Sequence, residues 1–284
     1  MSEEYIYPKK LKSGDTIRVI APARSINIIS EANIQHATTT LESIGLKVTF
    51  GKNVRNESHL GTASIQDRID DIHDAFTDKN IRGILTVIGG YSSNQLLPHL
   101  DYTLIKDNPK ILCGYSDITA LQHAIYSQSK LISYSGPHFS SFAMHKHLSY
   151  TQKHFEQMLF ESHPINIEPA DNYTDDAWYL NQQERDLVKN PGFWVIQPGR
   201  ADGTILGGNL GTLQLLSGST YYPNTINNVL FIEDVSNTSG HIDIQEWERN
   251  LHALTQQPLF KHTKALIIGR FERRFGVNRE LLTK

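Results

Sequence analysis

The sequence predicts an α/β protein with a mostly parallel sheet and helices on both of its faces. In the first half of the chain, short β-branched and apolar runs alternate with stretches of helical period. Glycine or proline stops most of the apolar runs, as at Pro22, Gly89 and Gly136. Repeated strand–helix units of this kind build a parallel sheet, because each crossover returns the chain to the same edge.

The elements of this Rossmann-like N-terminal part follow from those patterns. Ser30 is suited to cap the first helix, Ser64 starts the second, and a serine-containing turn precedes the third. Strands are expected at residues 16–21, 46–50, 83–88, 110–113 and 131–134, and helices at 30–44, 64–76 and 118–127. Within the second helix an apolar stripe is formed by Ile65, Ile69, Ile72 and Phe76. The turns after the last three strands share one edge of the sheet, where α/β proteins form their sites.

The second half of the chain predicts a smaller α/β domain. Residues 170–198 are polar and aromatic and are interpreted as an inter-domain loop or linker. The expected division is an N-terminal domain at 1–169, this linker, and a C-terminal domain at 199–284. In the C-terminal domain, strands are expected at 203–206, 228–234 and 264–269, and helices at 210–216, 244–254 and 278–284.

The composition places limits on the class of protein. The chain has 284 residues, of which 39% are hydrophobic and 20% charged, as in globular proteins with a sizeable core. Its net charge of −3 gives no electrostatic reason to expect nucleic acid or an anionic membrane as partner. The first residues have no apolar core of a signal peptide, and the one cysteine, Cys113, is expected to be a small core residue. A cytoplasmic location is the expectation.

The turn Gly114-Tyr115-Ser116-Asp117 has two interpretations. A serine between a strand and a helix presents its hydroxyl at the sheet edge, beside the amides that open the helix, and can act as a nucleophile. The same serine can be the N-cap of that helix. The local pattern is short and common and by itself favours the cap.

Two further features lie at predicted strand ends. Gly89-Gly90 can expose backbone N–H groups to a substrate oxygen, or can form a simple turn that needs positive φ. Glu233-Asp234 follows an apolar strand, where a carboxylate can orient a histidine, bind metal or only solvate the strand end. The last of these three interpretations is favoured by the pattern alone.

Several classes of site have no support in the sequence. The thirteen histidines form no helical metal-ligand pair, and His145 and His147 stand in a polar stretch. There is no glycine-rich dinucleotide fingerprint and no P-loop. No metal or cofactor is therefore expected.

Taken in order, these segments resemble the LD-carboxypeptidase and microcin C self-immunity family of serine peptidases. The resemblance covers nearly the whole chain and is specific through the order of its motifs rather than through any one of them. Its segments are 11–15, 21–22, 88–97, 114–119, 136–137, 207–210, 231–234 and 269–271. It reverses the preference at Ser116 in favour of the nucleophile.

The resemblance implies roles for individual residues. Ser116 would be the nucleophile and Glu233 the acid of a Ser-Glu-His triad, and the amides of Gly90 and Asp117 would form the oxyanion hole. The reaction implied is hydrolysis of an amide near a free carboxyl terminus, through an acyl-enzyme on Ser116.

The sequence departs from the family at the histidine. That residue is expected in a loop well after the Gly-Arg-Phe segment, whereas His241, His252 and His262 all precede Gly269. We therefore expect the chain to be truncated at its C-terminus, with an incomplete C-terminal domain, and residues 1–284 to be impaired or inactive. Full activity of the purified polypeptide would refute this expectation.

The resemblance also suggests two substrates. The inter-domain loop resembles the self-immunity branch, in which an aromatic side chain stacks on the nucleobase of a peptidyl-nucleotide, and Trp178 is the candidate here. Packing of Trp178 in the seam between domains is held as an equal alternative. The alternative enzyme is a muramoyl-tetrapeptide LD-carboxypeptidase. The alternative outside the enzymes is a catalytically dead protein that binds a peptide or nucleotide. A homodimer is expected from the family.

Overall fold

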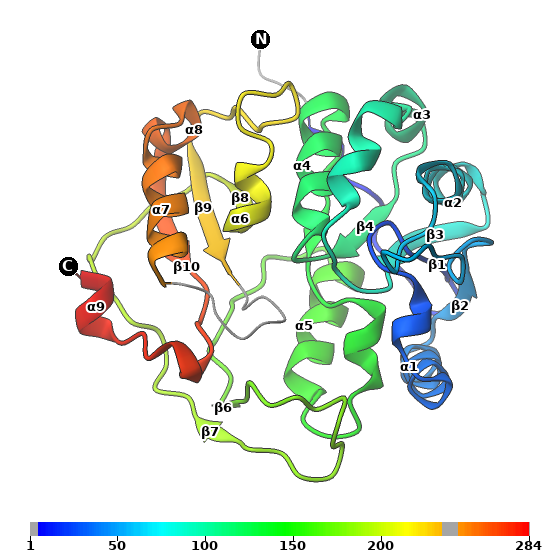
Figure 1. Ribbon diagram of the computed structural model, residues 1–284, viewed down its shortest axis with the longest axis horizontal. Helices are drawn as coiled ribbons and strands as arrows, with labels where there is room; N and C mark the ends of the chain where they lie inside the picture. The colour runs from blue at the N-terminus through cyan, green and yellow to red at the C-terminus, as the bar shows by residue number, and fades with distance from the viewer. Residues whose placement is uncertain (1–4, 235–243, 284) are drawn as a thin grey trace. The chain divides into compact units, whose positions relative to one another are not determined.

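A computed structural model describes residues 5–234 and 244–283 of the chain. These residues divide into two compact units. The first unit runs to Ile165 and includes Gly218–Tyr222, and the second holds Asn166–Ser217 and the chain from Pro223 onward. Each unit has a parallel sheet of its own (Figure 1). The domain boundaries expected from the sequence stay a prediction.

The first unit is built on five parallel strands in the order β2-β1-β3-β4-β5. Their bounds are Thr16–Ile20 for β1, Lys47–Phe50 for β2, Ile81–Thr86 for β3, Ile111–Gly114 for β4 and Tyr134–Ser135 for β5. The chain leaves β1 toward β2 and returns to the other side of β1 for β3. The segments that follow β1 and β3 therefore diverge, and this is the switch point at which such sheets bind ligands.

Helices cover this sheet on both faces (Figure 1). They are α1 (Glu31–Ser43), α2 (Ile65–Thr77), α3 (Tyr102–Asp107), α4 (Ile118–Ser129) and α5 (Ser149–Phe160). Ser30 caps α1 through its side chain, as predicted, and Ser64, the expected start of the second helix, caps α2 in the same way. The apolar stripe of α2 is buried except for Ile65, which is 38% exposed because it lies in the first turn. The predicted parallel α/β architecture is confirmed.

One predicted strand was mostly wrong. Residues 131–134 contribute only Tyr134 to β5, and Leu131 forms a single bridge with Ile6 instead. The apolar run is explained by burial, since Leu131 is fully buried although it lies outside the sheet.

The second unit holds three parallel strands in the order β10-β9-β8. Their bounds are Thr204–Asn209 for β8, Asn228–Glu233 for β9 and Thr263–Ile268 for β10. The helices are α6 (Leu210–Gln214), α7 (Ile244–Thr255), α8 (Pro258–Lys261) and α9 (Arg279–Thr283). Within residues 170–198, β6 (Asn172–Tyr173) and β7 (Val188–Lys189) pair as a short antiparallel ribbon.

Gly207 and Gly208 lie inside β8, although the sequence pattern predicted a strand that ends at Leu206. Both take positive φ, +120° and +126°. A methyl group at Gly207 would collide with the carbonyl oxygen of Phe231 on β9. Glycine therefore lets β8 continue beside β9 and deliver Asn209 to the end of the strand.

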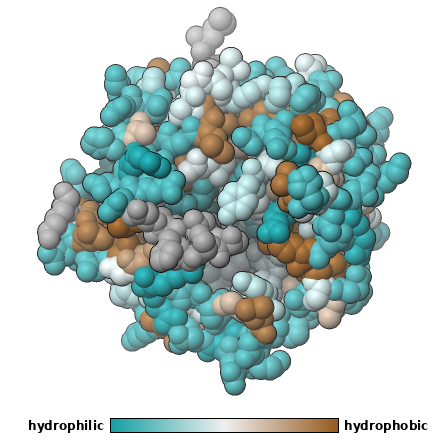
Figure 2. Space-filling view, viewed as in Figure 1, coloured by the Kyte–Doolittle hydropathy of each residue, from teal (hydrophilic) through white to brown (hydrophobic). Residues whose placement is uncertain are grey.

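Hydrophilic side chains predominate on the face of the molecule drawn in Figure 2, with small apolar patches between them. In the part of the chain that the structure describes, no helix has the length and apolar character needed to cross a bilayer.

Candidate active site

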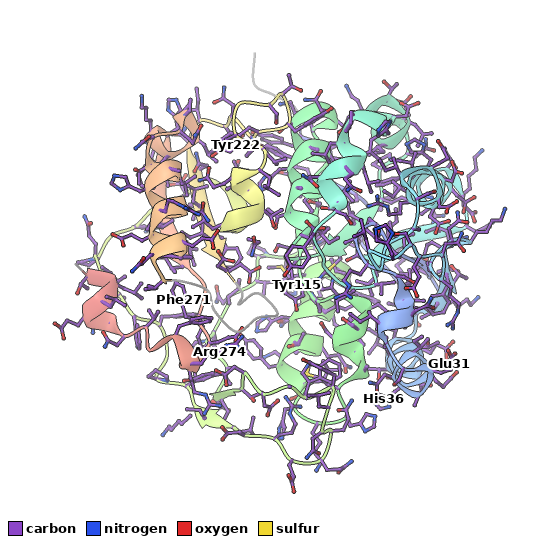
Figure 3. The ribbon with its side chains drawn as sticks, viewed as in Figure 1. Glu31, His36, Tyr115, Tyr222, Phe271 and Arg274 are labelled. Atoms are coloured by element: carbon purple, nitrogen blue, oxygen red, sulfur yellow. The ribbon has the colours of Figure 1, made fainter. Side chains whose placement is uncertain are left out.

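Ser116 lies in the tight turn between β4 and α4, directly after Tyr115 (Figure 3). Its φ of +62° is in the left-handed region, which is uncommon for serine. The N-cap of α4 is Asp117, which makes no side-chain capping bond, so the interpretation of Ser116 as the cap is wrong. A partly exposed serine in a strained strand-to-helix turn has the geometry of the nucleophile in α/β hydrolases.

Gly89 is packed against this serine. A methyl group at Gly89 would lie 3.0 Å from both Cβ and Oγ of Ser116 and 3.6 Å from the Asp117 amide nitrogen. Neither Gly89 nor Gly90 has positive φ, so the alternative of a turn that needs positive φ is also wrong. Glycine at position 89 lets the segment after β3 pass close to Ser116 without displacing the serine side chain.

The two amides assigned by resemblance to an oxyanion hole lie in these adjoining segments. Neither the Gly90 nor the Asp117 N–H donates a hydrogen bond to any residue that the structure describes. Both amides are therefore free of protein acceptors, as donors that receive a substrate oxygen must be.

The buried Asp117 carboxylate ties the two segments together. It accepts hydrogen bonds from the amides of Ser92 and Ser93, at 3.0 and 2.9 Å, while Ser93 Oγ donates to the Asp117 carbonyl at 2.5 Å. Burial raises the pKa of Asp117, against the lowering effect of these hydrogen bonds and of the Arg68 charge. Arg68 is itself buried and donates to the Ser92 carbonyl at 3.0 Å. The network holds the Gly89–Gly90 segment at a fixed position beside the serine turn.

His138 supports the turn from another side. Its ring stacks on Tyr115 with 4.2 Å between centroids, and Nδ1 is 2.8 Å from Thr86 Oγ1. Burial lowers the pKa of His138 to about 3, with a hydrogen bond to the Tyr115 backbone acting in the opposite direction. The ring is therefore neutral at physiological pH and engaged by its neighbours. The sequence pattern carried a signal for this residue, because His138 directly follows the Gly136-Pro137 stop at the same sheet edge.

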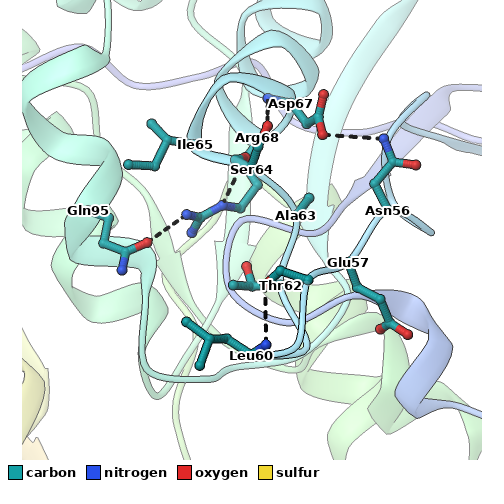
Figure 4. A pocket seen from close by; sticks show the side chains of 11 residues that line it. Asn56, Glu57, Leu60, Thr62, Ala63, Ser64, Ile65, Asp67, Arg68 and Gln95 are labelled. Atoms are coloured by element: carbon teal, nitrogen blue, oxygen red, sulfur yellow. Dashed lines mark hydrogen bonds between the residues drawn. The ribbon is translucent and has the colours of Figure 1, made fainter.

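A cavity of about 520 Å³ opens on the first unit near this network (Figure 4). Arg68 lines it and donates to Gln95 Oε1 at 2.7 Å and to the Ser64 carbonyl at 3.3 Å. Leu60 and Thr62, on either side of Gly61, also line it, whereas Ser116 and Gly90 do not.

In the second unit, Glu233 is the last residue of β9 and is partly exposed. Its register partner on β8 is Asn209. On the other side, a methyl group at Gly269 would lie 2.9 Å from Glu233 Cβ. The predicted acid thus stands at the carboxyl end of a parallel strand, between an asparagine and a closely packed glycine.

Asn209 was not predicted as a site residue. It is buried, accepts a hydrogen bond from the Thr212 amide at 2.8 Å, and donates to Asp234 Oδ1 at 3.0 Å. It therefore caps α6 and positions the carboxylate that follows Glu233. The Gly207-Gly208-Asn209 sequence was the available signal, since two glycines before an asparagine indicate a close backbone approach.

Trp178 is partly exposed and contacts Tyr179 edge to face at 6.0 Å between ring centroids. The segment around it is braced by ion pairs within the second unit. Arg185 Nε lies 2.9 Å from Asp176 Oδ1, and Arg273 pairs with Asp175 at 2.7 Å. These contacts give the loop a defined conformation around the tryptophan.

The downstream histidines and Cys113 are the remaining residues considered in the sequence. His252, on α7, and His262 are exposed, and His241 lies outside the described residues. Cys113 is buried, as predicted. Across residues 5–234 and 244–283, no group of three or more His, Cys, Asp or Glu side chains is placed to hold a metal ion.

Comparison with known proteins identifies relatives of the whole arrangement. YocD of Bacillus subtilis, which is named as a carboxypeptidase, is 46% identical over 98% of this chain and 84% of its own. The microcin self-immunity protein MccF of Escherichia coli is 30% identical over 92% of this chain and 77% of its own. A murein tetrapeptide carboxypeptidase of Pseudomonas aeruginosa is 24% identical over 82% of this chain and 70% of its own.

Solved structures agree with the fold. An MccF-like protein from Bacillus anthracis superposes with a TM-score of 0.95 at 45% identity, covering 98% of this chain and 84% of that one. MccF in complex with glutamyl sulfamoyl guanosine gives a TM-score of 0.86 at 28% identity, covering 97% of this chain and 86% of that one. Other MccF structures are a tryptophan-to-phenylalanine mutant with adenosine monophosphate and an active-site mutant with a serine, an asparagine and a lysine replaced by alanine.

Family models match both halves of the chain. The LD-carboxypeptidase N-terminal domain matches residues 17–136, and the LD-carboxypeptidase C-terminal domain matches residues 202–283. The chain therefore belongs to the LD-carboxypeptidase family of serine peptidases, with MccF among its relatives.

Proposed function

We propose that the protein is a serine carboxypeptidase that hydrolyses an amide bond through an acyl-enzyme on Ser116. The observation that carries the proposal is the left-handed backbone of Ser116 with Gly89 against its hydroxyl. This turn presents Oγ for attack, and the amides of Gly90 and Asp117 receive the oxyanion that forms on the substrate carbonyl. Glu233 orients and stabilises the general base, and the base is assigned to none of the described residues.

Covalent labelling tests the nucleophile. A fluorophosphonate probe should add its mass to the peptide that contains Ser116, and Ser116→Ala should abolish the adduct. Ser135→Ala is the matched control, since Ser135 is exposed at the end of the neighbouring strand β5. Labelling of another serine, or no labelling of a chain that hydrolyses its substrate, would contradict the proposal and favour another nucleophile.

For the substrate, we propose an aminoacyl- or peptidyl-nucleotide. Support comes from the 30% identity to MccF, from the sulfamoyl nucleosides bound in its solved structures, and from Trp178 in a braced, partly exposed position. The similarity to a murein tetrapeptide carboxypeptidase supports the muramoyl tetrapeptide as the second candidate. Parallel assays of the full-length protein on an aspartyl-adenylate analogue and a muramoyl tetrapeptide decide between them by their kcat/KM values.

The role of Trp178 has its own test. Stacking on a nucleobase contributes roughly 1–3 kcal/mol in other systems, so Trp178→Ala should lower kcat/KM for the nucleotide substrate about 5- to 150-fold. Cleavage of the tetrapeptide should change much less. Trp194→Ala, which removes another exposed tryptophan of the same unit, is the control. Equal losses on both substrates would exclude the stacking role.

A further inference from the structure

Arg24 stands at the switch point of the first sheet. It follows β1 in the segment Ala21–Arg24, and Gly90 follows β3, so the two residues leave adjacent strands on either side of the point where the chain changes direction. Ligands bind at such points in open α/β sheets, because the diverging segments leave room beyond the strand ends.

The side chain of Arg24 packs against Gly90, whose amide is proposed to bind the oxyanion. A methyl group at Gly90 would lie 2.9 Å from Arg24 Cγ and 3.4 Å from the Arg24 amide nitrogen. Farther along the side chain, Nη2 would lie 3.5 Å from a methyl group at Gly61. The guanidinium thus extends from Gly90 toward Gly61, whose neighbours Leu60 and Thr62 line the open cavity of Figure 4.

Within residues 5–234 and 244–283, no acidic side chain neutralises the Arg24 guanidinium. Arg24 makes no hydrogen bond or ion pair with any residue that the structure describes, although its side chain is partly buried. Arg68, the other arginine of this region, donates instead to the Pro22 and Ser92 carbonyls and to Gln95. Arg68 is therefore committed to the protein, whereas Arg24 is available to an anion.

We propose that Arg24 is a specificity residue that binds the anionic group on the leaving side of the scissile amide. Both candidate substrates carry such a group: a carboxylate on a terminal amino acid, or a phosphate on a nucleotide. A guanidinium matches either one through paired N–H donors. The inference rests on the proposed function, because the position of the anion is argued relative to the substrate carbonyl whose oxygen the Gly90 amide binds.

The test compares two substrate pairs, and one member of each pair lacks the anionic group on the leaving side. One pair is a muramoyl tetrapeptide and its C-terminal carboxamide, and the other is an aspartyl adenosine phosphoramidate and the neutral aspartyl amide of 5′-amino-5′-deoxyadenosine. Arg24→Met keeps the methylene that lies against Gly90 and removes the charge. Of the two pairs, the one that the enzyme cleaves gives the result. For its anionic member, Arg24→Met should raise KM roughly 10- to 100-fold with little change in kcat. For its neutral member, KM and kcat should not change.

Arg24→Lys should restore part of the preference, since it keeps the charge without the paired donors. Arg82→Met is the control, because Arg82 is exposed at the opposite end of β3 and should leave both members unchanged. Equal effects of Arg24→Met on the anionic and neutral members would overturn the inference and leave the proposed function intact.

Binding of both pairs to Ser116→Ala separates the remaining outcomes. Arg24-dependent binding of the anionic member without cleavage by the wild type would refute the hydrolase and uphold Arg24 only as an anion-binding residue. If none of the four compounds binds and the wild type cleaves none of them, both the inference on Arg24 and the proposed function are refuted.

Discussion

The two proposed catalytic side chains stand in comparable places but are held differently. Ser116 and Glu233 each come at the carboxyl end of a parallel strand, and each has a glycine packed against it, Gly89 and Gly269 respectively. Ser116 is in a strained turn supported by the buried Asp117 and His138. Glu233 belongs to the regular strand β9 and takes no unusual φ. A nucleophile that must attack from one direction needs an enforced backbone, whereas an acid that only orients a base can use ordinary strand geometry.

The largest expected difference between the two regions is in rate. Ser116→Ala should lower kcat by about 10⁴- to 10⁶-fold, because it removes the group that forms the acyl-enzyme. Glu233→Gln should cost about 10²- to 10⁴-fold, because it removes orientation and charge but leaves the nucleophile. Single-turnover kinetics of the full-length protein measure both. Equal losses would show that Glu233 takes part in bond making, and a larger loss at Glu233 would reverse the assignment.

The two packed glycines sharpen the same comparison. Gly89→Ala places a methyl group 3.0 Å from Ser116 Oγ and should lower kcat roughly 100-fold, since small displacements of a nucleophile are costly. Gly269→Ala places one 2.9 Å from Glu233 Cβ and should lower kcat only about 10-fold. Thermal unfolding of both variants shows whether each stays folded. A stronger effect at Gly269 would mean that the acid is the more tightly constrained of the two.

Variants of Asp117 test whether the serine turn holds the Gly89–Gly90 segment in position. Asp117→Ala leaves the Ser92 and Ser93 amides without their acceptor and removes the negative charge near the buried Arg68, and should lower the free energy of unfolding by about 3 kcal/mol. Asp117→Asn keeps one acceptor oxygen and should recover part of both stability and kcat. Urea unfolding and kcat are measured on each variant. Normal kcat in a folded Asp117→Ala protein would show that the Gly90 amide needs no such support.

His138 tests the support of the serine turn through pH, and its effect is absent at neutral pH. Its pKa is about 3 in the folded protein and near 6.5 when unfolded, so the unfolded chain binds the proton first. The stability from the neutral ring is present above pH 6.5 and is lost as pH falls toward 3, by at most about 1.4 kcal/mol per pH unit. His138→Gln should flatten the acid limb of the unfolding free energy, while the exposed His262→Gln should not. Hydrogen exchange in the first unit is the measurement, and an unchanged slope would contradict the buried neutral ring.

Fluorescence distinguishes the two units in such experiments. All three tryptophans, Trp178, Trp194 and Trp247, belong to the second unit. Tryptophan emission therefore follows the second unit, and amide exchange is needed to follow the region around Ser116.

Much of the first unit was predictable because its signals are local. The caps at Ser30 and Ser64 and the strands that end near Gly89 and Gly114 are written in short stretches of sequence. The weak point was β5, where the apolar run reflects burial of Leu131 rather than pairing.

The site was predictable only in part. The choice between cap and nucleophile at Ser116 depends on a φ angle that no local pattern specifies. The contacts of Asp117 with Ser92 and Ser93, and of His138 with Thr86, join residues more than twenty positions apart. Such pairs follow from the register of the sheet rather than from any one segment, so residue patterns alone could not show them.

The left-handed turn at Ser116 also has an evolutionary consequence. An L-residue other than asparagine or aspartate loses about 1 kcal/mol or more in this conformation, so Ser116→Gly relieves the chain while removing its nucleophile. Selection for hydrolysis is then the force that keeps serine in place. In lineages where that selection has ended, position 116 is where glycine or asparagine should accumulate first, and a glycine there would mark a descendant that binds without cutting.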